Sequence, residues 1–124
     1  MILGIGTDMI ETERVKLKIS KNRGFKEHVF SKNEIGYCEK MTNTYQNYAA
    51  RFAAKEALLK AFGTGLSSDL LLHEIEILND EKGKPFFNFI GETKNIIYKK
   101  GLTKIHVSIS HLKDIASAFV IIEQ

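Results

Sequence analysis

Two acidic residues stand at positions where the surrounding pattern predicts apolar side chains. Glu56 lies in the helical stretch 45–62, and Asp8 lies in the short apolar run 1–10, which is typical of a buried strand. The helical neighbours of Glu56 at steps of three and four residues are Tyr45, Tyr48, Ala49, Phe52 and Leu59. A buried carboxylate without a partner is costly, so each should be protonated, paired with a cation or bound to a metal.

The strand pattern suggests how these two carboxylates could meet. Alternation places Asp8 on the same face as Gly4 and Gly6, where another backbone or a ligand could approach closely. If the helix packs on this strand, Asp8 and Glu56 would form a hard, oxygen-only site suited to Mg²⁺, completed by waters and substrate phosphates. The chemistry would be metal-assisted transfer or cleavage of a phosphate ester.

Simpler interpretations of both residues remain open at this point. Lys60 follows Glu56 by four residues, which is the favourable spacing for a salt bridge along one helix. Asp8 could cap the helix that follows its strand, or it could pair with a lysine.

Length and composition indicate one globular domain. The chain has 124 residues, of which 44% are hydrophobic and 27% charged. Its longest apolar stretches are strand-sized, and its first residues enter a strand directly, so we expect no membrane span, no secretory signal and a cytoplasmic protein. The single cysteine, Cys38, excludes a disulfide within this sequence and is expected to be structural.

The basic residues are distributed unevenly. The net charge is only +3, yet residues 14–26 contain six basic side chains and no acidic one. These are Arg14, Lys16, Lys18, Lys21, Arg23 and Lys26. Nucleic acid, an anionic membrane or an acidic protein could be the partner, and a solvated helix face is the simplest alternative. Only Phe25 is aromatic here, so a stacking platform for nucleic acid is not indicated.

The remaining pattern predicts an α+β fold with a long central helix and a β-rich C-terminal half. The expected strands cover residues 2–10, 70–78, 86–90, 104–111 and 115–122. The expected helices cover residues 11–20, 25–30, 31–41, 45–62 and 91–100. Ser31 and Glu34 have the spacing of a capping box, and Gly63 ends the central helix. The last two strands should form an antiparallel hairpin, and the four histidines lack the spacing of a zinc site.

Four segments of the chain resemble the holo-[acyl-carrier-protein] synthases, the small bacterial type of 4'-phosphopantetheinyl transferase. They are GIGTDMIE at Gly4–Glu11, RFAAKEALLKAFGTG at Arg51–Gly65, GKPFF at Gly83–Phe87 and HVSISH at His106–His111. They occur in the family's order and spacing, and together they span nearly the whole chain. Thr7 departs from the family, where hydrophobic residues are frequent.

The resemblance implies a Mg²⁺-dependent transfer of the phosphopantetheine arm of coenzyme A to a serine of apo acyl carrier protein. Adenosine 3',5'-bisphosphate would be released. By the same resemblance, Asp8 and Glu56 are the metal ligands, and Lys60 neutralises phosphate charge in the transition state. Glu56, or a water that it orients, is the candidate general base.

The resemblance also assigns the surroundings of this site. Arg51, Lys55, Lys84 and His111 match positions near the phosphates of coenzyme A, while Gly63 and Gly65 would let the backbone approach the nucleotide. Arg14, followed by Lys18 and Lys21, would begin the surface that receives the acidic carrier protein. Members of the family are α+β trimers with active sites between subunits, so a homotrimer is expected.

Two readings from other classes compete with the transferase. A basic module that binds RNA or DNA would use the 14–26 stretch, but it leaves both carboxylates unexplained, so we expect no nucleic-acid partner. A purely structural domain would hold Asp8 and Glu56 in salt bridges.

Overall fold

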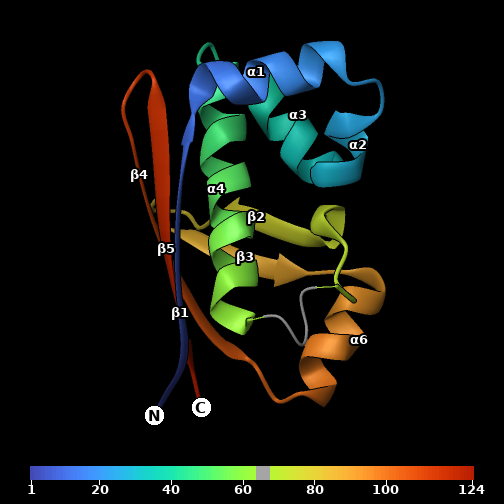
Figure 1. Ribbon diagram of the computed structural model, residues 1–124, viewed down its shortest axis with the longest axis vertical. Coiled ribbons are helices and arrows are strands. Elements are labelled where there is room, and N and C mark those ends of the chain that lie inside the picture. The colour runs from blue at the N-terminus through green and yellow to red at the C-terminus, as the bar shows by residue number, and fades with distance from the viewer. Residues whose placement is uncertain (64–67) are drawn as a thin grey trace.

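A three-stranded antiparallel sheet forms one layer of the protein (Figure 1). In this computed structural model, which describes residues 1–63 and 68–124, the strands are β1 (Ile2–Glu11), β4 (Lys104–His111) and β5 (Ile115–Glu123). Their order is β1-β5-β4, so the first and last strands of the chain are hydrogen-bonded neighbours. The predicted C-terminal hairpin is confirmed. Thr7, the departure from the family pattern, donates its hydroxyl to the carbonyl oxygen of Ala118 on β5.

A long helix, α4 (Thr44–Phe62), lies along one face of this sheet (Figure 1). The N-terminal helices gather around one end of α4, and a two-stranded hairpin with a last helix covers its other side. Those helices are α1 (Thr12–Lys21), α2 (Phe25–Val29) and α3 (Lys32–Lys40). The covering elements are η1 (Leu72–Glu74), β2 (Ile75–Asn79), β3 (Pro85–Phe89) and α6 (Gly91–Lys99). Among the described residues, no helix is both long enough and apolar enough to cross a bilayer.

Most expected elements are present, including the capping box. Ser31 accepts from the Glu34 amide, and the Glu34 carboxylate accepts from the Ser31 amide. The strand expected at 70–78 is wrong over its first half, because only Ile75–Asn79 is extended and paired. The polar groups of the preceding segment are satisfied elsewhere, since Leu71 donates to the hydroxyl of Thr93, which itself donates to Glu74.

The contact between α4 and β1 is a direct backbone approach. A Cβ atom at Gly6 would overlap the carbonyl oxygen of Ala57, and one at Gly4 would overlap that of Ala61. Ala57 is fully buried in this contact and Ala61 nearly so. The helix therefore packs on the glycine face of the strand, and small residues on both elements allow this close contact.

Alanines and branched side chains fill the interior around α4. One buried cluster lies between α4, the sheet and the β2–β3 hairpin, and its largest members are Leu58, Ile75, Ile77, Ile97 and Ile122. A second cluster joins α4 to α1–α3, and it includes Val15, Phe30, Cys38 and Tyr48. Burial raises the pKa of the Cys38 thiol to about 12, with Arg51 opposing, so Cys38 is a core residue rather than a nucleophile.

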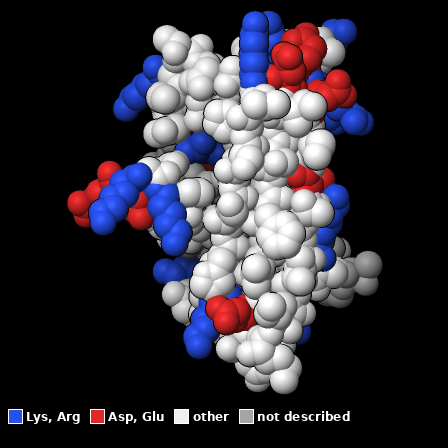
Figure 2. Space-filling model, turned by 90° about the vertical axis from the view of Figure 1, so that its left-hand side faces the viewer, with Lys and Arg blue, Asp and Glu red and all other residues white. Residues whose placement is uncertain are grey.

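The outer face of the sheet is apolar and open. Ile5 is 56% exposed, Met9 69% and Phe119 45%, and all three point away from α4. Figure 2 shows that the middle of this face carries no charged side chains, which gather at its margins. An uncovered apolar sheet face of this kind marks an interaction surface.

We predict that Gly6→Ala strongly destabilises the protein, by about 1–3 kcal/mol or more, because its Cβ meets backbone that cannot move aside without separating α4 from β1. Gly36→Ala is the matched control. Gly36 lies at an exposed position of α3, with open space where a Cβ would go. This change should therefore stabilise the protein by up to about 1 kcal/mol. Urea unfolding of both variants checks the contrast, and equal stabilities would contradict the close approach.

Candidate active site

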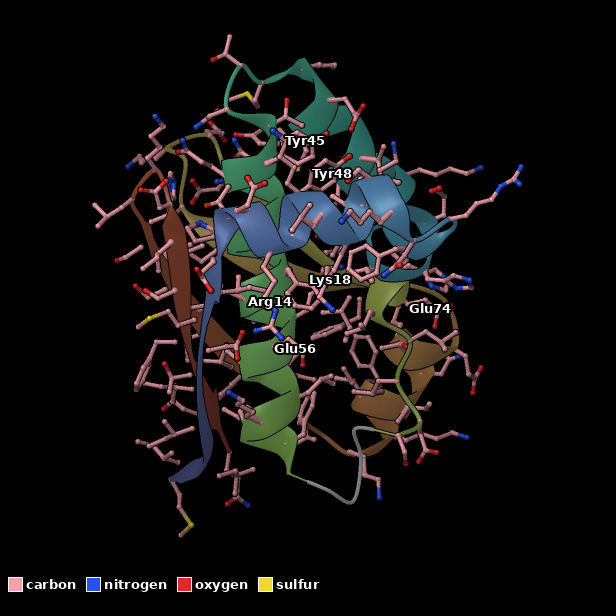
Figure 3. All side chains as sticks on the ribbon, turned by 45° about the horizontal axis from the view of Figure 1, so that its top comes forward. Arg14, Lys18, Tyr45, Tyr48, Glu56 and Glu74 are labelled. Atoms are coloured by element: carbon pink, nitrogen blue, oxygen red, sulfur yellow. The ribbon has the colours of Figure 1, made fainter. Side chains whose placement is uncertain are left out.

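Asp8 and Glu56 line one open pocket of about 260 Å³. Asp8 comes from β1 and Glu56 from α4, so the expected packing of the central helix on the first strand brings them together. Arg14 and Lys18 of α1 form another wall, and Figure 3 shows both pointing toward Glu56. Phe52, Met9 and Ile10 complete the lining. The pocket therefore places two acidic groups beneath a cationic rim.

Lys60 pairs with Asp8 rather than with Glu56. Its Nζ lies 2.9 Å from Asp8 Oδ1 and also donates to the Thr7 carbonyl oxygen at 3.0 Å. The helical Glu56–Lys60 bridge is thus replaced by a pair between α4 and β1. Asp8 does not cap α1, because the N-cap residue is Glu11. The pair is partly open to solvent, with the Lys60 side chain 58% exposed, so its amine remains accessible to a ligand.

Glu56 is held in an environment that disfavours its charge. Burial raises the pKa of Glu56 above its ordinary value, and the negative charge of Asp8 raises it further. Lys60 and Lys18 act in the opposite direction without cancelling the shift. Asp8 and Glu56 are therefore close enough to repel one another, and a cation bound between them would relieve that repulsion.

The donor set of this pocket fits Mg²⁺. Two carboxylates supply hard oxygen ligands, and the described part of the chain has no group of three His, Cys, Asp or Glu side chains placed to enclose a metal. Zinc sites normally take three or four protein ligands, whereas Mg²⁺ commonly keeps several waters and is bound by one or two carboxylates plus substrate phosphates.

The other expected ligand residues lie elsewhere in the structure. His111 ends β4, at the opposite edge of the sheet from Asp8 on β1. Arg51 donates to Asn79 Oδ1 at 3.1 Å, at the end of β2, and Lys84 is exposed in the turn that follows. Because β3 packs against β4, these three residues belong to the β4 side of the molecule. None of them lines the Asp8–Glu56 pocket.

Lys55, which the resemblance places near the phosphates of coenzyme A, is turned into the interior of the structure. Its amine is completely buried and donates to Glu34 Oε1 at 2.7 Å, to the Leu72 carbonyl oxygen at 2.8 Å and to the Ile75 carbonyl oxygen. All three N–H groups are therefore used inside the protein. Glu34, read from the sequence as a helix cap, is the buried partner that sequence reasoning missed.

The remaining predicted residues that the structure describes are at least partly exposed. Gly63 is the exposed C-cap of α4 with φ 80°, a left-handed conformation that glycine adopts readily, while Gly65 lies outside the described residues. On α1, Arg14 and Lys21 are exposed, and the Lys18 amine lies 5.8 Å from the centre of the Phe25 ring. The basic face thus begins at the pocket and continues along α1.

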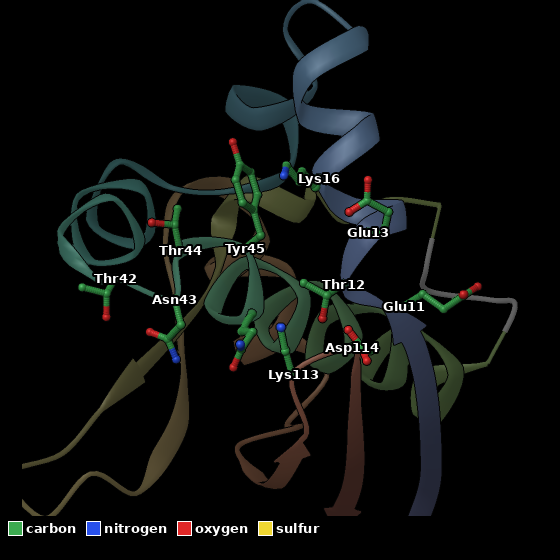
Figure 4. Close-up of a pocket in the computed structure, with 11 residues that line it drawn as sticks. Glu11, Thr12, Glu13, Lys16, Thr42, Asn43, Thr44, Tyr45, Lys113 and Asp114 are labelled. Carbon is green, nitrogen blue, oxygen red and sulfur yellow. The ribbon is translucent and has the colours of Figure 1, made fainter.

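A second pocket, of about 500 Å³, lies at the end of the molecule shown in Figure 4. It is bounded by the start of α1, the turn before α4 and the β4–β5 turn. Its lining mixes charges of both signs, namely Glu11, Glu13, Lys16, Lys113 and Asp114. No predicted site residue reaches it, so the smaller Asp8–Glu56 pocket is the candidate active site.

Residues 4–120 match the 4'-phosphopantetheinyl transferase superfamily. The chain belongs to this superfamily. Holo-[acyl-carrier-protein] synthase of Ruminiclostridium cellulolyticum is 48% identical over 95% of this chain and 90% of its own length. The synthase of Clostridium tetani is 46% identical over 99% of this chain and 97% of its own length.

Solved structures of such synthases share the whole fold with this member of the superfamily. The crystal structure of the enzyme from Neisseria meningitidis has a TM-score of 0.89 at 31% identity and covers both chains completely. The enzyme from Bacillus anthracis, solved in complex with CoA (3',5'-ADP), has a TM-score of 0.82 at 35% identity over 100% of this chain and 98% of its own. The expected α+β fold is confirmed.

We predict that Glu56→Gln stabilises the metal-free protein at neutral pH. The folded protein binds the Glu56 proton more tightly than the unfolded chain, so the stability contributed by Glu56 falls as pH rises from below 4.5 through the raised folded value. Glutamine removes this cost, and the difference should vanish well below pH 4.5. Urea unfolding between pH 4 and 8 measures it. A variant less stable than the parent at pH 7 would show that an attractive contact holds Glu56 instead.

Proposed function

We propose that this protein transfers the 4'-phosphopantetheine arm of coenzyme A to a serine of apo acyl carrier protein, in a Mg²⁺-dependent reaction that supports fatty acid synthesis in the cytoplasm. The observation that carries the proposal is the pocket in which Asp8 and Glu56 lie under the basic residues of α1. The two solved synthases named above share this fold over nearly their whole length, and the one from Bacillus anthracis was solved in complex with CoA (3',5'-ADP).

The proposed reaction is a displacement at phosphorus. The serine oxygen forms a bond to the phosphorus that bears the pantetheine arm, and the bond from that phosphorus to the bridging pyrophosphate oxygen breaks. Adenosine 3',5'-bisphosphate leaves with the bridging oxygen. Glu56, or a water that it orients, is the candidate acceptor of the serine proton, because it lies in the pocket beside Asp8.

The neighbouring groups would hold the pyrophosphate. Asp8 and Glu56 would bind Mg²⁺, which when bound stabilises negative charge on phosphate oxygens. The Lys60 amine reaches the same place from α4 and would offset charge on the leaving group. The glycine at the exposed end of α4, Gly63, lets a nucleotide approach the backbone without meeting a side chain.

The basic face of α1 suits an acidic carrier protein. Arg14, Lys18 and Lys21 recur at steps of four and three residues, so they lie along one side of the helix. Arg14 and Lys18 also line the candidate active site, so a protein docked on α1 would present its serine there. Charge complementarity of this kind speeds association and selects the partner.

We further propose a homotrimer with each active site shared between two subunits. Asp8 and Glu56 lie at the β1 edge of the sheet, whereas the exposed residues Lys84 and His111 lie on the β4 side. A ring of subunits, formed by head-to-tail contacts whose rotation closes after three copies, would bring the second group of one chain to the first group of the next. The open apolar sheet face supplies a surface for such contacts.

A carrier-loading assay tests the activity. With coenzyme A and Mg²⁺, apo carrier protein should gain the mass of one phosphopantetheine arm, and Asp8→Asn should lower kcat/KM by about 10²–10³-fold, the scale for losing one preorganised electrostatic contact. Glu92→Gln, an exposed carboxylate on α6, is the matched control and should transfer normally. No mass gain with any of a panel of bacterial carrier proteins would overturn the proposed function.

Mixing two inactive variants tests the shared site. Asp8→Asn and His111→Ala should each be inactive as pure trimers, but a random equal mixture should recover about a quarter of the wild-type activity, because one interface in four joins two intact halves. Light scattering should give the mass of three chains. A site contained in one subunit would give no recovery on mixing.

A further inference from the structure

The contact between α4 and β1 fixes the distance between helix and strand better than it fixes the rotation of the helix about its own axis. The touching surfaces are the glycine face of the strand and the alanine side of the helix, with Ala57 and Ala61 against Gly6 and Gly4. Such surfaces allow close approach, but they lack the interlocking side chains that hold a helix at one rotation about its axis. The direction in which Glu56 points must therefore be set by other contacts of α4.

A buried ion pair next to Glu56 in the sequence provides a directional contact. The Lys55 amine has three acceptors, which are Glu34 Oε1 and the carbonyl oxygens of Leu72 and Ile75. Both Lys55 and Glu34 are completely buried. The single amine thus ties α4 to the start of α3 and to the segment that enters β2.

The partner of Lys55 is itself fixed from two sides. Glu34 Oε1 also accepts from the Ser31 amide at 3.0 Å, and Glu34 Oε2 accepts from the Ile77 amide at 3.0 Å on β2. The hydrogen bonds of this one ion pair therefore join four elements, which are α3, α4, η1 and β2. Hydrogen bonds are directional, so moving or turning α4 would lengthen several of them together.

We infer that Lys55 is a positioning residue for the phosphoryl-transfer site, acting with Glu34 to fix the rotation of α4 and thus the placement of Glu56. The inference rests on the proposed function. Lys55 and Glu56 are consecutive, so they project about 100° apart, one into the interior and the other into the pocket. Lys60 lies on the same helix and is carried with Glu56 against Asp8.

The geometry gives the size of the effect. At the radius of helical side chains, a rotation of about 20° moves a carboxylate by roughly 2 Å. Catalytic groups must be held within about 0.5 Å of their working position. A displacement of about 1 Å can lower the rate about 10²-fold.

The test replaces the pair while keeping its volume. In Glu34→Gln/Lys55→Met both charges disappear together, which avoids leaving one buried charge without a partner. We expect Mg²⁺ affinity, measured by calorimetry on the metal-free protein, to fall at least tenfold. We also expect kcat at saturating Mg²⁺ to fall about 10²-fold with KM for the carrier protein unchanged, because the α1 surface is not altered.

Glu34→Gln alone preserves shape and serves as the second variant. The variant keeps the Lys55 amine, but its side-chain NH2 group replaces the oxygen that accepts from the Ile77 N–H, so this hydrogen bond is lost. The Mg²⁺ affinity of the variant should therefore fall between those of wild type and the double variant. Ile97→Ala is the matched control for lost stability. Ile97 is a core residue of α6 without a polar contact to α4, and the Ala variant should unfold more easily yet keep its Mg²⁺ affinity and kcat.

The outcomes separate the two claims. Wild-type affinity and kcat in both pair variants would overturn the positioning role while leaving the transferase intact. Equal losses in Ile97→Ala would also overturn it, since they would show that general destabilisation is enough. A wild-type protein that neither binds Mg²⁺ nor loads a carrier overturns the proposed function and the positioning role together.

Discussion

The close approach of α4 to β1 is the constraint on which the rest of the structure depends. Gly4 and Gly6 clear one face of the strand so that the carbonyl groups of Ala57 and Ala61 can lie against it. A side chain at Gly4 or Gly6 would separate the helix from the sheet, and it would thereby separate Glu56 and Lys60 from Asp8. The electrostatics of the pocket follow from this distance, because the charge of Asp8 contributes to the raised pKa of Glu56.

The charged residues at the centre of α4 have different roles. Glu56 lines a pocket open to solvent, Lys60 pairs with Asp8, and Lys55 faces the interior. The buried Lys55–Glu34 pair adds little net stability by the usual balance of desolvation against attraction. What it does add is direction, because its hydrogen bonds are directional, whereas the contact of α4 with β1 is made by glycines and alanines alone.

The sequence predicts the fold and the carboxylate pair well for identifiable reasons. Helical periodicity, the Ser31 capping box and the glycine at the end of α4 are local signals, and they place nearly every element correctly. Asp8 and Glu56 stand out because they break apolar patterns. The partner of Lys55 could not be predicted in this way, since Glu34 already satisfies a local motif and its second task depends on tertiary contacts with β2. The overlong strand at 70–78 fails for the same reason, because Lys55 and Thr93 bind polar groups of this segment that a neighbouring strand would otherwise take.

The pairing of β1 with β5 has a consequence for how the protein is made. Asp8 is opposite Ala118, so the strand that carries the first carboxylate gains its neighbour only when β5 has been synthesised. Contacts between distant parts of a chain are slow to form, because the loop between them must first be closed. During synthesis, the helices can form before β5 is made, while the hydrogen-bonding edge of β1 is still unpaired. The Asp8–Glu56 pocket is thus completed only after β5 has been synthesised, because β5 is the strand that pairs with β1.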